Sequence, residues 1–132
     1  MTDVLAVLVE ATERVLRDLL DTSGPNVRLH LEAAPDDVGS WRVDAVFDDM
    51  TAGFGVAVGR ERHSELIVAV ADGLQHAFIE RLWAARPVCP LHEHPLAADD
   101  AGGHARWTCP SSGAWSCPIG SSHESGDRGA HR

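Results

Sequence analysis

The chain has 132 residues, of which 44% are hydrophobic, so it can form one globular domain or a compact domain with a small appended module. Its 20 acidic residues outnumber 11 basic ones, and the formal net charge is −9. This balance argues against nucleic-acid binding, which needs basic side chains at the phosphate backbone. No apolar run approaches the ~20 residues of a membrane span, and the first residues lack a basic leader pattern. These features predict a cytoplasmic protein that does not contact membranes.

The first predicted element is an amphipathic helix over residues 3–21. Apolar side chains recur along it at helical spacing, which is typical of a helix with one face in a core. They are Val4, Leu8, Ala11, Val15 and Leu19. Gly24 and Pro25 follow and cannot continue a helix.

Three strands are predicted next. Apolar and polar residues alternate over 27–32 and 41–48, and a third, glycine-spaced pattern covers 54–58. Such alternation indicates strands with one buried and one largely polar face. The connections are short, so we expect an antiparallel meander.

A second, longer helix is predicted over residues 61–85. Its apolar stripe is formed by Ile67, Ala71, Leu74, Phe78 and Leu82. Gly73 should weaken the middle of this helix by ~1 kcal/mol relative to alanine, and Pro87 requires the helix to end near Arg86. The expected fold class is α+β: helix, three-stranded antiparallel sheet and helix, with both helices on the apolar face of that one sheet.

The composition changes after this helix, which suggests three parts. Residues 1–86 should form the α-β-β-β-α domain and residues 87–120 a small zinc-ribbon-like hairpin, with a turn at 99–103. Residues 121–132 contain almost no apolar side chains and are predicted to be a disordered tail.

The chemistry of the chain is concentrated in the predicted hairpin. All three cysteines lie between positions 89 and 117, and an odd number suits a reducing compartment and a metal role. Cys89 and Cys109 each precede a proline, and His92 and His94 follow the first of these turns. Zinc takes about four thiolate and imidazole ligands in a tetrahedron, so this pattern predicts a zinc site.

The fourth ligand is open on spacing alone. In a complete zinc ribbon, the turn that begins at Cys109 would carry a second ligand, Cys or His, at position 112. This chain has Ser112 there. His94, Cys117 and, as a weaker choice, His104 can each complete the set. Because His92 and His94 are two apart on an extended segment, both can point to the same ion.

The same motifs resemble a group of small uncharacterised actinobacterial proteins. Their pattern is a helix ending in Leu-Trp, then Cys-Pro-x-His-x-His-Pro-Leu, Trp-x-Cys-Pro and a closing Pro-Ile-Gly, as at Leu82-Trp83, 89–96, 107–110 and 118–120 here. The resemblance covers residues 66–120 and carries no activity that could be transferred. It implies the ligand set Cys89, His92, His94 and Cys109, with Cys117 an addition of this chain.

The expected function is that of a small zinc-binding protein, a binding or adaptor module for a protein partner that the sequence does not identify. Zinc should be structural and stabilise the hairpin alone, and no catalytic residue is predicted. The alternative is a zinc-dependent hydrolase with an open coordination position and Glu93 as the base. A nucleic-acid-binding ribbon is a third possibility, which the acidic balance disfavours.

Overall fold

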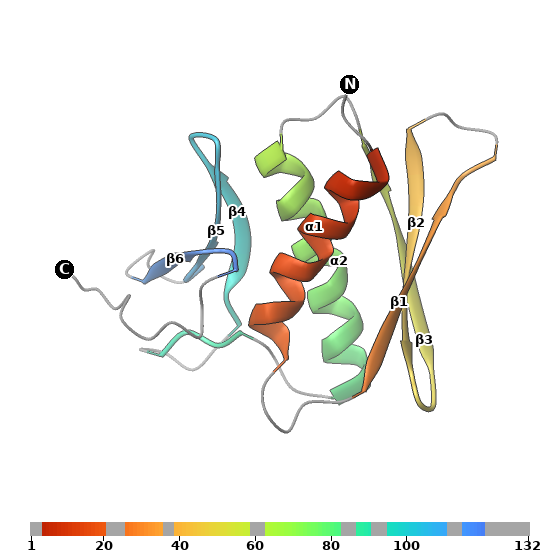
Figure 1. The fold of residues 1–132 in the computed structure, drawn as a ribbon. Coiled ribbons are helices and arrows are strands. Elements are labelled where there is room, and N and C mark those ends of the chain that lie inside the picture. The colour runs from red at the N-terminus through yellow and green to blue at the C-terminus, as the bar shows by residue number, and fades with distance from the viewer. Residues whose placement is uncertain are drawn as a thin grey trace.

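A computed structural model gives the fold of the chain (Figure 1). It describes residues 4–20, 26–35, 39–58, 63–82, 87–90, 95–110 and 115–120. Over these residues the protein is α+β, with two helices and two three-stranded antiparallel sheets. The predicted α+β class is therefore confirmed, whereas the predicted order is matched only in part, because a second three-stranded sheet follows the second helix. The zinc-ribbon-like hairpin stays a prediction. The predicted tail, residues 121–132, lies outside the described residues.

Helix α1 spans Val4–Leu19, close to the predicted range. The side chains spaced along its apolar stripe are fully buried, and these are Leu8, Ala11, Val15 and Leu19. Glu13 and Arg17 are exposed on the opposite side. Helical periodicity thus placed the core-facing side of α1 correctly.

The first sheet consists of β1 (Val27–Ala33), β2 (Ser40–Phe47) and β3 (Thr51–Ala57), in that order and antiparallel. The predicted meander is confirmed. Its inner face carries the apolar row of β2, where Val43, Ala45 and Phe47 are buried. The other face carries the charged side chains of β1, because successive residues of a strand point to opposite sides.

Helix α2 spans His63–Leu82 and is buried on several sides. Its buried residues are Ser64, Leu66, Ile67, Val70, Ala71, Leu74, Gln75, Ala77 and Phe78, a set too broad for one apolar stripe. The buried part of α2 is wide enough to contact more than one neighbour, while Asp72, His76 and Glu80 on the remaining side are exposed. Gly73 fits this position, because a Cβ atom there would collide with the ring of Phe54 on β3.

The second sheet consists of β4 (Ala97–Ala101), β5 (His104–Thr108) and β6 (Ser116–Pro118), in that order and antiparallel. Two glycines with positive φ, Gly102 at 62° and Gly103 at 90°, make the turn between β4 and β5. The turn is therefore shorter than the predicted 99–103.

Asp99 and Asp100, which were predicted to lie in this turn, belong to β4. The Asp100 carboxylate accepts the backbone N–H of Gly103 at 3.1 Å and so stabilises the turn from the strand. Strand β6 was not predicted, since three residues are too few for a recognisable alternation.

The arrangement of layers differs from the prediction. The helices form a middle layer, with β1–β3 on one side and β4–β6 on the other (Figure 1). We had expected both helices to cover a single sheet. The second sheet covers the other side because β5, β6 and the residue after β6 supply buried apolar side chains of their own, namely Trp107, Cys117 and Ile119.

The buried residues of both sheets and both helices belong to one hydrophobic cluster. Phe78 of α2 and Phe47 of β2 meet edge to face in it, with ring centroids 5.4 Å apart. The domain boundary between residues 86 and 87 stays a prediction. Neither of the described helices is long and apolar enough to span a membrane.

Candidate metal centre

Two short backbone closures define the region around Cys89. Val88 and Pro95 form an isolated antiparallel bridge, and Leu96 donates its N–H to the carbonyl of Pro87 at 3.0 Å. The chain therefore leaves after Cys89 and returns at Pro95. Val88 is exposed, whereas Cys89 is fully buried, so the cysteine side chain points into the protein.

A second closure defines the region around Cys109. This residue follows β5 directly, and its N–H donates to the carbonyl of Trp115 at 2.9 Å. Cys109 is 1% exposed, while Pro110 beside it is exposed. The arrangement matches the first closure: a Cys-Pro step opens a short segment whose ends are held together by the backbone.

The Cys-Pro steps at Cys89 and Cys109 lie at the same end of the β4–β5 hairpin, and the third Cys-Pro step of the chain, at Cys117, lies in β6. Ala97 pairs with Thr108, so continuing this register by one residue places Leu96 beside Cys109. Cys89 lies next to the returning Pro95–Leu96 segment. Cys89 and Cys109 therefore flank this segment, at the end of the hairpin away from the glycine turn.

The predicted histidine ligands His92 and His94 lie outside the described residues, as do Glu93 and Ser112. Their part in the site stays a prediction. Within the described part of the chain, no three His, Cys, Asp or Glu side chains form a group that could hold a metal ion.

His104 is excluded as a partner of Cys109. It is the first residue of β5, next to the glycine turn, and its side chain is exposed. It lies five positions before Cys109 along an extended segment, which corresponds to about 16 Å at the usual rise per residue. One zinc ion cannot bind both side chains, because each ligand must lie within about 2.3 Å of it.

Cys117 occupies a different position from the other two cysteines. It lies on β6 directly opposite Trp107 of β5, and both residues are buried. Directly opposite residues of an antiparallel pair point to the same face, which here is the face toward the helices. The three cysteines form no disulfide and no three-thiol group. This placement favours a packing role for Cys117.

Two buried polar side chains hold this module against the helices, and the sequence did not identify either as functional. The Gln75 amide on α2 donates to the carbonyl of Leu96 at 2.7 Å. Asp18 on α1 accepts the indole N–H of Trp107 at 2.7 Å and the backbone N–H of Gly120 at 2.6 Å. The only signal in the sequence was a polar residue next to the apolar stripe of each helix.

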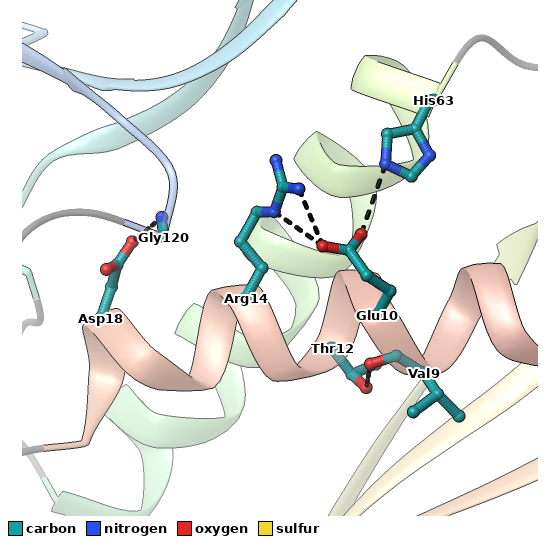
Figure 2. A network of polar contacts seen from close by, with 7 residues as sticks. All are labelled: Val9, Glu10, Thr12, Arg14, Asp18, His63 and Gly120. Carbon is teal, nitrogen blue, oxygen red and sulfur yellow. Dashed lines mark hydrogen bonds and ion pairs between the residues drawn. The ribbon is translucent and has the colours of Figure 1, made fainter.

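A polar cluster also lies on the surface of the helical layer (Figure 2). Glu10 accepts two hydrogen bonds from Arg14, at 3.1 and 2.8 Å, and its other oxygen lies 3.4 Å from Nε2 of His63. These three side chains are 37–52% exposed. Ion pairs so open to water contribute little stability and do not form an enclosed catalytic site.

The chain matches no family model, and no curated protein or solved structure is significantly similar to it.

Proposed function

We propose that the protein is a small binding or adaptor protein whose C-terminal module holds one structural zinc ion through Cys89, His92, His94 and Cys109. One observation carries this proposal. Two of the three Cys-Pro steps, those at Cys89 and Cys109, are brought to the same end of the β4–β5 hairpin, each at the start of a segment closed by backbone hydrogen bonds.

The burial of the two thiols supports a structural role for the ion. Cys89 and Cys109 are 0% and 1% exposed. Structural zinc sites have four protein ligands and no water, whereas a catalytic site keeps one position open. The alternative of a hydrolase with Glu93 as base therefore has weaker support, because substrate and water would have to reach an ion between buried sulfur atoms.

The position of Cys117 supports the choice of His94 as the fourth ligand. A site built from all three thiols would require Cys117 to approach both Cys89 and Cys109. Cys117 packs opposite Trp107, and among the described residues the three thiols do not form a group. Removing Cys117 from the set leaves the two histidines beside Cys89 as the sequence-based candidates.

Elemental analysis of protein expressed with zinc tests the proposal, with about one zinc per chain expected. Cys89→Ser and Cys109→Ser should abolish stoichiometric zinc, and Cys117→Ser, which replaces an equally buried thiol, is the matched control. X-ray absorption of the zinc-loaded protein should give two sulfur and two nitrogen neighbours. Protein without metal would refute the zinc site, and a coordinating water in place of one nitrogen would favour the hydrolase.

A further inference from the structure

We propose that the free edge of β1 binds the β1 strand of a second copy of this chain. The two strands would run antiparallel about a twofold axis at His30, and the two three-stranded sheets would become one continuous sheet. This proposal concerns the sheet β1–β3 and does not depend on the metal site.

The backbone of β1 leaves a regular row of groups for a partner. Strand order places β1 at one edge of its sheet, and no described residue pairs with its outer side. Ala34 donates its N–H to the carbonyl of Ser40, which identifies the residues that bond to β2. In an antiparallel ladder these residues alternate, so Arg28, His30 and Glu32 also bond to β2. The residues between them direct their N–H and C=O groups to the free edge, and they are Val27, Leu29, Leu31 and Ala33.

The charges of β1 are complementary to themselves in one register. A twofold axis at His30 places Arg28 of each copy opposite Glu32 of the other. Both residues are exposed and lie on the outer face. They would occupy non-hydrogen-bonded positions, where cross-strand side chains come closest. Shifting the axis to Leu29 or Leu31 loses both Arg–Glu pairs.

The inner face of β1 supplies an apolar row in the same register. Val27, Leu29 and Leu31 are packed against the core but remain partly exposed. Pairing about His30 places Leu29 beside the second copy's Leu31, and each pair covers apolar surface next to the edge. The strand has seven residues and lacks proline and inward-pointing charge, the usual features that prevent edge pairing.

The other long edges do not offer this complementarity. Strand β3 carries no charged side chain to set a register, and it contains two glycines. Strand β4 carries Asp99 and Asp100, so pairing with itself would bring carboxylates together. Strand β1 is therefore the edge with both an attractive charge pattern and an apolar row.

The proposed contact leaves the candidate metal centre uncovered within each copy. Sheet β1–β3 lies on the opposite side of the helices from β4–β6 (Figure 1). The occupation of the metal site can therefore be kept constant while the β1 edge is changed.

Sedimentation of the full chain over a concentration series tests the proposal. We expect a dimer that dissociates on dilution. Arg28→Glu puts a carboxylate opposite Glu32 of the other copy, and the twofold axis repeats this repulsive pair. The substitution should therefore weaken the dimer roughly tenfold. Glu32→Arg should weaken the dimer to the same degree, because it puts a second guanidinium opposite Arg28 in each pair. Combining both substitutions reverses the polarity of each pair and should restore the dimer. Arg17→Glu, an exposed change of the same charge on α1, is the control and should have no effect.

A second variant tests the backbone contact. Ala33 is exposed, and its N–H points to the free edge. Because proline has no N–H, Ala33→Pro removes one donor at each end of the symmetric interface. The substitution keeps the hydrogen bonds between β1 and β2. It should weaken the dimer with unchanged circular dichroism. A chain that stays monomeric up to millimolar concentration overturns the proposal. So does a dimer that responds to neither single reversal, or one that the combined reversal fails to restore.

Discussion

Asp18 of α1 accepts a hydrogen bond from the indole N–H of Trp107, at 2.7 Å and across 89 positions of the sequence. The same carboxylate oxygen accepts the backbone N–H of Gly120 at 2.6 Å. Asp18 is 8% exposed and Trp107 is fully buried. A buried carboxylate is tolerated only where donors replace water, so these two bonds tie the second sheet to the first helix.

Replacing Trp107 by phenylalanine should therefore destabilise the protein more than its loss of volume suggests. The ring remains apolar, but the buried carboxylate loses a donor, and we expect a loss of about 1.5–3 kcal/mol in the free energy of unfolding. Urea denaturation measures it. Trp115→Phe, at a partly buried tryptophan in the same module, is the control. Equal losses in the two variants would show that the Asp18 contact contributes nothing specific.

Gln75→Leu should detach α2 from the start of β4. The amide of Gln75 donates to the carbonyl of Leu96 in a buried position, and leucine would leave that carbonyl without this donor. The expected loss is about 1–3 kcal/mol in the free energy of unfolding, measured by thermal and denaturant unfolding. His76→Leu changes the adjacent exposed residue and should be close to neutral. A stabilised Gln75→Leu variant would contradict the assigned role.

Gly73→Ala should destabilise the protein although alanine is the better helix former. In an exposed helix this change would gain ~1 kcal/mol, but here the new Cβ meets the ring of Phe54. Thermal unfolding should show a lower midpoint for the single variant. In a Phe54→Ala background, Gly73→Ala should instead raise the midpoint, because the obstructing ring is absent. The same effect in both backgrounds would rule out the steric explanation.

Cys117→Ser should lower stability while keeping the metal. A hydroxyl replaces a thiol that is buried opposite Trp107, which costs about 1–3 kcal/mol where no new partner forms. In a cobalt-substituted sample, the thiolate-to-metal absorption band should keep its intensity. A band reduced by about a third would make Cys117 one of three thiolate ligands and remove His94 from the proposed set.

Chelation of the proposed zinc should affect α1 as well as the C-terminal module. From the sequence alone, loss of metal was expected to loosen residues 87–120 only. The contact between Asp18 and Trp107 connects this module to the last turn of α1. Hydrogen exchange should therefore increase in β4, β5 and the end of α1, and β1–β3 serves as the internal reference. Unchanged protection around Asp18 would show that the contact survives without metal.

The local structure of this chain follows from the order of its side chains. The spacing of Leu8, Ala11, Val15 and Leu19 is helical, and the alternation in β1 and β2 has period two, so both patterns specify an element and its buried face. Short connections then required an antiparallel meander. The Cys-Pro steps at Cys89 and Cys109 were visible in the same way, because a metal-binding pattern is read from residue type and spacing.

The tertiary structure decided what these patterns leave open. Periodicity does not specify what lies on each side of α2, so the second sheet on the far side of the helices could not be predicted. The partners of Asp18 and Gln75 lie in distant segments, and a polar residue beside an apolar stripe can equally face water. The positions of Cys117 opposite Trp107 and of His104 at the far end of β5 depend on strand register. Register is set by side-chain packing between segments, which sequence spacing alone does not determine.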